Sequence, residues 1–192
     1  MLKAEGQPSA SRILNLEALA RADLLVVFCR RLGLQPEQLT TIRNHLAAGK
    51  PVVGIRTANH AFSVRGEIPP GYAAWWEFVA DVLGAENRGY APAESATSVS
   101  IVREAGGHVI LSGVPAAWQS KGNLYFTTPL IDREAAVLLV GAVGDRTEPI
   151  AWTRMADKSR VFYTSLGHPT DFQVPHFQTL LVNAIRWALG QE

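Results

Sequence analysis

The pattern of apolar and polar residues along the chain predicts buried strands joined by amphipathic helices. Residues 23–28 ("DLLVVF") and 51–55 ("PVVGI") are apolar runs of strand length, as expected for strands covered on both faces. Between them, residues 35–50 have apolar side chains at helical spacing, after an early proline and before a glycine. This order of strand, helix and strand implies parallel strands joined by a right-handed crossover.

Similar patterns predict the other elements. A short helix is expected at residues 14–22, a second at 72–84 with Trp76 on its buried face, and an amphipathic helix at 174–190 that covers the sheet. Alternating or β-branched segments predict further strands, at residues 97–102, 123–131, 135–143, 149–155 and 161–168. The alternation at 123–155 is typical of antiparallel or edge strands added to a parallel core.

Together these elements predict a single α/β domain over residues 1–192. We expect a flavodoxin-like three-layer sandwich with a mostly parallel central sheet, helices on both faces and antiparallel strands at the edge. A chain of 192 residues is long enough to bury one large core.

Composition narrows the function. A net charge of +1 with no basic stripe gives no reason to expect nucleic acid or an acidic membrane surface as a partner. Cys29 is the only cysteine, so the chain can form neither an internal disulfide nor a multi-cysteine metal site. We expect no metal and no cofactor. No apolar run approaches the roughly 20 residues that span a bilayer, and the first residues do not resemble a secretory signal, so the expected location is cytoplasmic.

The candidate chemistry lies where predicted strands end. Polar side chains follow three apolar runs, at Arg30 and Arg31, at residues 56–60, and at residues 168–171. If these strands are parallel, their carboxyl ends meet at one edge of the sheet, where ligands usually bind. Arginines there favour an anionic or polyhydroxylated ligand, because a guanidinium presents five donors in a rigid fork.

Catalytic and binding roles can be assigned within this cluster. His60 and His168 titrate near neutrality and are the candidate acid and base, and Asp171 could orient a histidine or accept from a hydroxyl. The candidate substrate-binding residues are Arg30, Arg31, Arg56, Thr57, Asn59, Trp75 and Tyr125. A purely structural interpretation stays open, in which Arg56 pairs with a carboxylate, His60 is a satisfied loop residue and the tryptophans belong to the core.

Other chemistries leave no trace in the sequence. The motifs of serine hydrolases, phosphate-binding loops, zinc proteases and dinucleotide-binding folds are all absent. Cys29 ends an apolar run and is interpreted as an inert buried thiol.

Two long segments resemble a known family. Residues 51–62 ("PVVGIRTANHAF") and 160–190 ("RVFYTSLGHPTDFQVPHFQTLLVNAIRWALG") closely resemble the trehalose-utilisation (ThuA-like) family, within the class I glutamine amidotransferase-like superfamily, and residues 113–130 are also similar. True amidotransferases carry a cysteine nucleophile in "GICxG", whereas Arg56 stands in that slot here. Their histidine is followed by "PE", and here the text is "HPT". A histidine-rich loop found in relatives has no counterpart in "AENRGYAPAE".

The resemblance implies a sugar-processing protein, most simply a hydrolase acting on a glycoside or an oxidised (keto) sugar, without glutaminase activity. The alternative is a non-catalytic carbohydrate-binding or assembly domain that lost the nucleophile; the lack of a paired-carboxylate signature favours it. An N-terminal strand and helix of the family have no counterpart in this sequence. The apolar strand at 24–28 would then need another partner, so we expect a homo-oligomer that associates near the N-terminal segment.

Overall fold

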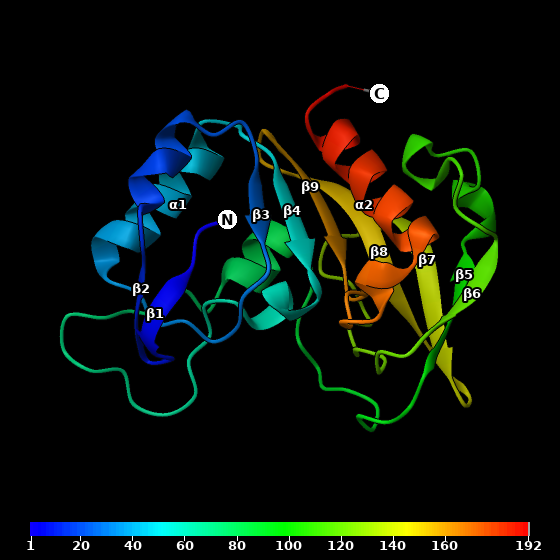
Figure 1. Ribbon diagram of the computed structural model, residues 1–192, viewed down its shortest axis with the longest axis horizontal. Helices are drawn as coiled ribbons and strands as arrows, with labels where there is room; N and C mark the ends of the chain where they lie inside the picture. Colours follow the sequence, from blue (N-terminus) through cyan, green and yellow to red (C-terminus); the bar gives the residue numbers. More distant parts are fainter. Residues whose placement is uncertain (192) are drawn as a thin grey trace.

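The computed structural model describes residues 1–191 as an α/β fold built on a curled, seven-stranded mixed sheet (Figure 1). In spatial order the strands are β3 (Leu25–Val27), β4 (Val52–Ile55), β9 (Ser159–Thr164), β8 (Arg146–Ala156), β7 (Ala136–Val143), β5 (Thr97–Ile101) and β6 (Ala117–Ser120). The α-helices are α1 (Pro36–Ala47) and α2 (Pro175–Ala188). No helix in the described part of the chain is long and apolar enough to cross a membrane.

Short elements complete the fold. A separate hairpin pairs β1 (Ala4–Gln7) with β2 (Ala10–Ile13). The short helices are η1 (Leu16–Arg21), η2 (Arg56–His60), η3 (Val79–Leu83), η4 (Arg103–Ala105), η5 (Val109–Leu111) and η6 (Asp171–Gln173). Of these, η3 is a π-helix and the others are 3-10 helices.

The expectation of a mostly parallel sheet is wrong. Only the pairs β3–β4 and β4–β9 are parallel, and the four pairs from β9 across to β6 are antiparallel. The reason is the length of the connections. Two residues, Gly144 and Asp145, join β7 to β8, and a link this short allows only a hairpin, since a parallel return needs a long crossover.

The two α-helices pack against opposite faces of β4. Val52 belongs to an apolar cluster that contains Leu39 and Ile42 of α1, whereas Val53 belongs to a second cluster that contains Phe177 of α2. Successive side chains of a strand point to opposite faces, so this alternation separates the two helices. The strand, helix, strand order predicted for residues 24–55 is confirmed.

Strand β3 lies at the edge of the sheet, although its sequence predicts a strand covered on both faces. It pairs with β4 alone, and the side chains of Val26 and Phe28 are 46% and 50% exposed. The N-terminal segment does not cover the edge, because β1 pairs with β2 instead.

Two local predictions are also wrong. Trp76 was expected in the core but is 54% exposed, whereas its neighbour Trp75 is buried against Phe62 and Phe78. The helical register assumed for residues 72–84 does not exist, since only η3 forms there. Residues 123–131 are not a regular strand: they include Pro129, which has no N–H to donate to a ladder, and they form only an isolated bridge from Tyr125 to Tyr90.

Candidate functional site

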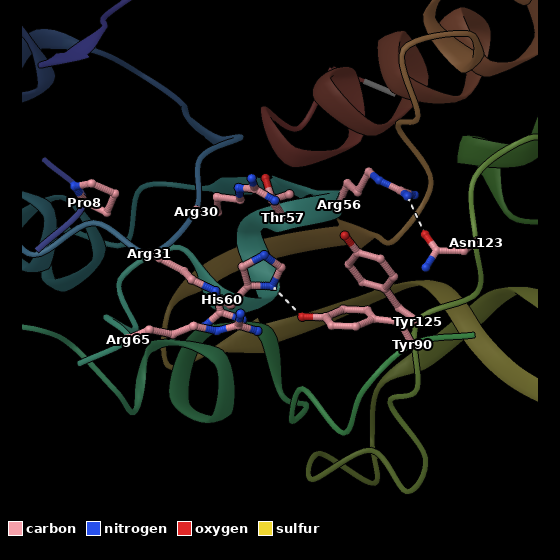
Figure 2. Close-up of a pocket in the computed structure, with 10 residues that line it drawn as sticks. All are labelled: Pro8, Arg30, Arg31, Arg56, Thr57, His60, Arg65, Tyr90, Asn123 and Tyr125. Carbon is pink, nitrogen blue, oxygen red and sulfur yellow. Dashed lines mark hydrogen bonds between the residues drawn. The ribbon is translucent and has the colours of Figure 1, made fainter. Parts of the chain in front are cut away.

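A cavity of about 610 Å³ opens at the carboxyl ends of β3 and β4. Its volume falls in the range of roughly 300–1,000 Å³ that small-molecule sites occupy. Figure 2 shows the side chains that line it: Pro8, Arg30, Arg31, Arg56, Thr57, His60, Arg65, Tyr90, Asn123 and Tyr125. The expected meeting of polar strand ends at one sheet edge is therefore observed for β3 and β4.

The backbone after each of these strands turns sharply to reach the cavity. Arg56 follows β4 with a φ of 43° and begins η2 at once, and Arg31, beyond β3, has a φ of 58°. The left-handed region is costly for residues other than glycine and tends to occur at functional sites. The two turns are joined, because Arg31 N donates to the carbonyl of His60 at 2.9 Å.

The Arg56 side chain is held by uncharged groups. Its guanidinium donates to Asn123 Oδ1 at 2.8 Å and to the carbonyl of Ser165 at 3.2 Å, and it lies over the ring of Tyr125 at 4.9 Å from the centroid. Asn123 is fixed in turn by donating to the carbonyl of Ala91. The structural alternative in which Arg56 pairs with a carboxylate is therefore not what the structure shows.

The other three arginines of the cavity are less constrained. Arg30 and Arg65 are exposed, and Arg31 is half-buried with one long bond, 3.4 Å, from Nη1 to the carbonyl of Ser63. The ion pairs found within residues 1–191 all involve other arginines. No carboxylate of residues 1–191 lines the cavity.

His60 is buried beneath these arginines and is neutral. Its Nδ1 contacts Asn59 Oδ1, an acceptor, and lies 3.1 Å from Asn87 Nδ2, a donor; Tyr90 Oη lies 3.3 Å from the same atom. Nδ1 therefore has partners for either neutral tautomer of the ring. Burial, followed by the charges of Arg31, Arg30 and the two other cavity arginines, lowers the pKa of His60 to about 4. The second ring nitrogen, Nε2, lies on the side of the ring turned away from Tyr90 (Figure 2).

The second predicted pair, His168 and Asp171, lies at the same sheet edge but outside the lining of the cavity. The buried Asp171 carboxylate accepts from Ser120 Oγ and from the backbone N–H groups of Gly167 and His168, each at 2.9 Å. It therefore holds the loop after β9 and does not orient an imidazole. His168 Nδ1 contacts Thr170 Oγ1 at 2.8 Å.

A close approach links this pair to the cavity. A Cβ at Gly122 would lie 2.7 Å from Arg56 Nη1 and 3.1 Å from His168 Cβ, so only glycine fits between them.

Two of the proposed binding residues also lie outside the cavity. Asn59 is buried and supports His60, and Trp75 packs in the core beneath Arg43. The sequence analysis missed Pro8, Arg65, Tyr90 and Asn123. Tyr90 and Asn123 are brought to the cavity by the bridge between Tyr90 and Tyr125. This bridge joins segments 35 residues apart, so no local sequence pattern predicts it.

Metal and thiol chemistry find no support among the described residues. No group of three His, Cys, Asp or Glu side chains in residues 1–191 is placed to hold a metal ion. Burial raises the pKa of the Cys29 thiol to about 12, which fits the expected inert thiol. What the cavity offers is a neutral imidazole, two tyrosines and many hydrogen-bond donors, a set suited to a small polar ligand.

Comparisons with known proteins identify the fold and the family. A family model described as ThuA, trehalose utilisation, matches residues 4–188. ThuA-like proteins of Bacteroides uniformis and Parabacteroides merdae are each 19% identical to this chain, with TM-scores of 0.69 and 0.67; they cover 90% and 89% of this chain, which covers 71% of each.

A cytoplasmic protein of Salmonella typhimurium LT2 is 15% identical, with a TM-score of 0.67 and coverage of 94% of this chain and 78% of its own. At these identities the likeness shows the fold alone. No curated protein matches the sequence.

Proposed function

Because this chain belongs to the ThuA, or trehalose-utilisation, family, we propose that it processes a sugar in the cavity lined by Arg30, Arg56 and His60. The proposed reaction is hydrolysis of a glycoside or of an oxidised (keto) sugar. The observation that carries this proposal is the buried, neutral His60, set among hydrogen-bond donors in a cavity of small-molecule size. The proposed tautomer has the proton on Nδ1, toward Asn59 Oδ1, and Nε2 as the acceptor.

An oxidised sugar suits a site that has no pair of carboxylates. Ordinary glycoside hydrolysis uses two such groups, and none lines this cavity. A ketone makes the neighbouring C–H acidic, so His60 Nε2 can remove that proton while arginine donors stabilise the enolate oxygen. The enolate then expels the glycosidic oxygen from the next carbon and forms a carbon–carbon double bond. The proton on His60 passes to that oxygen, and addition of water to the double bond completes a net hydrolysis.

Each cavity group has a proposed role in this scheme. His60 is the base and then the acid, and Asn59 positions its ring through Nδ1. Arg56 binds the carbonyl side of the sugar, and the Tyr125 ring, on which that guanidinium stacks, forms the adjoining wall. His168 and Asp171, outside the cavity, are assigned to holding the loop after β9.

The alternative remains a non-catalytic carbohydrate-binding or assembly domain. The engagement of Asp171 with backbone groups favours it, since one of the three candidate catalytic side chains is then structural. Glutamine hydrolysis is not proposed, because the cavity lining contains no cysteine and the Cys29 thiol is protonated.

Release of reducing sugar from a panel of glycosides and their keto derivatives distinguishes the two functions. We expect the native protein to turn over at least one keto glycoside, and His60→Ala to lose about a hundredfold in rate, as is typical for removal of a general base. His108→Ala, a histidine substitution outside the cavity, is the matched control and should keep the rate. Sugar binding without any turnover would favour the binding domain, and equal loss in both variants would remove His60 from the mechanism.

We also propose a cytoplasmic homo-oligomer. Proteins described as cytoplasmic among the structural neighbours support the location. The outer edge of β3 has no partner strand within residues 1–191, and unpaired apolar edges tend to associate. We expect light scattering to give a dimer for the native protein and for Val182→Lys, an exposed site on α2, but a monomer for Val26→Lys. A native monomer at high concentration would refute self-association.

A further inference from the structure

The cavity has an excess of hydrogen-bond donors. Four of its lining residues are arginines, whose guanidinium groups donate and never accept. The side-chain acceptors are few. Asn123 Oδ1 already accepts from Arg56, and Tyr90 Oη accepts from the side chain of Asn87. Thr57, Tyr125 and Nε2 of His60 are what remains.

A neutral sugar is a poor match for a cavity with so many hydrogen-bond donors and so few acceptors. Each sugar hydroxyl both donates and accepts, so protein sites for neutral sugars need acceptors as well as donors. A phosphate or a carboxylate only accepts when it is ionised, and it matches the fork of a guanidinium with two parallel bonds. The side chains of this cavity therefore fit a ligand that brings its own negative charge.

The arginines divide into two groups. Arg56 donates hydrogen bonds to Asn123 and Ser165 and stacks on Tyr125, so it is fixed at one end of the cavity. Arg30 and Arg65 have no partner in the described structure, and Arg31 has one long bond. Figure 2 shows Arg31 and Arg65 extending toward the imidazole of His60, and Arg30 beside Thr57.

Such a cluster is unfavourable in the absence of an anion. Like charges that converge on one concave surface repel one another, and concave surfaces of one sign concentrate counter-ions. The salt bridges elsewhere in the chain show that its arginines pair with carboxylates where these are in reach. Here three arginines from two loops line one cavity, and no acidic side chain of residues 1–191 lines it with them.

We infer that the sugar bound in this cavity is anionic, carrying a phosphate monoester or a carboxylate that Arg30, Arg31 and Arg65 hold while Arg56 and the tyrosines contact the sugar ring. This deepens the proposed function and rests on it, because the ring contacts assume a carbohydrate.

Calorimetric titration with four probes tests the inference. The probes are glucose, glucose 6-phosphate, glucuronate and inorganic phosphate, each at low and high salt. We expect at least one charged sugar to bind about tenfold or more tightly than glucose, with an affinity that falls as salt rises. The stronger of glucose 6-phosphate and glucuronate identifies the acidic group.

Matched variants locate the charge. Arg30→Ala/Arg65→Ala should remove the advantage of the charged sugar over glucose, whereas Arg103→Ala/Arg186→Ala, which removes the same charge from exposed positions outside the cavity, should retain it.

Each remaining outcome contradicts a specific statement. Glucose binding as tightly as both charged sugars overturns the inference and leaves the proposed sugar function standing. Inorganic phosphate binding as tightly as glucose 6-phosphate supports an anion site but contradicts recognition of a sugar. Loss of the advantage in both double variants alike shows general electrostatics and overturns the assignment to Arg30 and Arg65. No binding of any probe overturns the inference, and the turnover assay with keto glycosides then decides the proposed function separately.

Discussion

The arginines of β8 and those of the cavity differ in how far their guanidinium groups are paired within the protein. Arg154 pairs with Asp132, 2.6 Å from Nε to Oδ2, and donates to the carbonyls of Asp81 and Val82 at 2.8 Å. It joins three segments and has no donor directed at a ligand. In the cavity, Arg30 and Arg65 have no protein partner. An arginine whose guanidinium is fully paired within the protein is structural. A group of arginines without protein partners in a cavity indicates a ligand.

The acid partners explain why the two regions differ. Glu148, only 1% exposed, accepts from the backbone N–H groups of Thr127 and Thr128 at 2.9 and 2.7 Å as well as from Arg146. The pKa of Glu148 is lowered despite its burial, because these bonds favour the carboxylate. The carboxylates of β8 and its neighbour segment therefore anchor irregular backbone, and the cavity contains no comparable group.

The largest expected effect on stability is that of removing the Glu148 carboxylate. Glu148→Ala should lower the free energy of unfolding by about 3 kcal/mol, because it strands buried backbone donors and removes the partner of Arg146. Urea denaturation measures it, and Glu148→Gln, which keeps an acceptor but loses the charge, should cost less. A loss below about 1 kcal/mol for the alanine variant would show that this carboxylate does not anchor residues 127–128.

An intermediate effect on stability is expected from the titration of His60, whose pKa is lowered by burial and by the cavity arginines. Its pKa is about 4 when folded and 6.5 as the reference value. Between these pH values the unfolded chain binds a proton that the folded chain does not, so stability should rise with pH from about 4 to 6.5. The contribution at neutral pH is about 2 kcal/mol after allowance for solvent screening.

The measurement is the free energy of unfolding against pH for the native protein and His60→Gln. Carboxylates such as Glu148 also titrate at the acid end of this range, so the difference between the two curves isolates the imidazole. Parallel curves across pH 4–6.5 would show that burial and the cavity arginines together leave the pKa of His60 unchanged.

The smallest expected effect on stability is that of removing Arg30 and Arg65. Arg30→Ala/Arg65→Ala should change the free energy of unfolding by less than about 0.5 kcal/mol, with a small gain at low salt as like charges are removed. Arg154→Ala should cost about 2 kcal/mol, because it breaks a mostly buried ion pair and two bonds to carbonyls. A cavity variant as unstable as Arg154→Ala would show that these arginines support the fold after all.

Part of the site was predictable because it follows strands directly. Arg30, Arg31, Arg56, Thr57 and His60 all come within a few residues of β3 or β4, and all line the cavity as expected. Asp171 accepts from the hydroxyl of Ser120, one of the two roles expected for it, but an acidic residue near a histidine gives no sign of the backbone N–H groups that its carboxylate also accepts from. Arg65 lies in a loop whose path has no periodicity.

Local sequence pattern is enough to set several elements: the α1 and α2 helices, the buried β4 and β9 strands, and the polar turns that follow β3 and β4. These depend on the spacing of apolar residues and on side chains a few positions apart. Long-range packing sets the edge position of β3, the joining of β5 and β6 to the antiparallel half of the sheet, and the closing of the cavity by Tyr90 and Asn123. Those outcomes depend on which distant segments pack together, and that choice minimises unpaired backbone and exposed apolar surface over the whole chain, which no short stretch of it encodes.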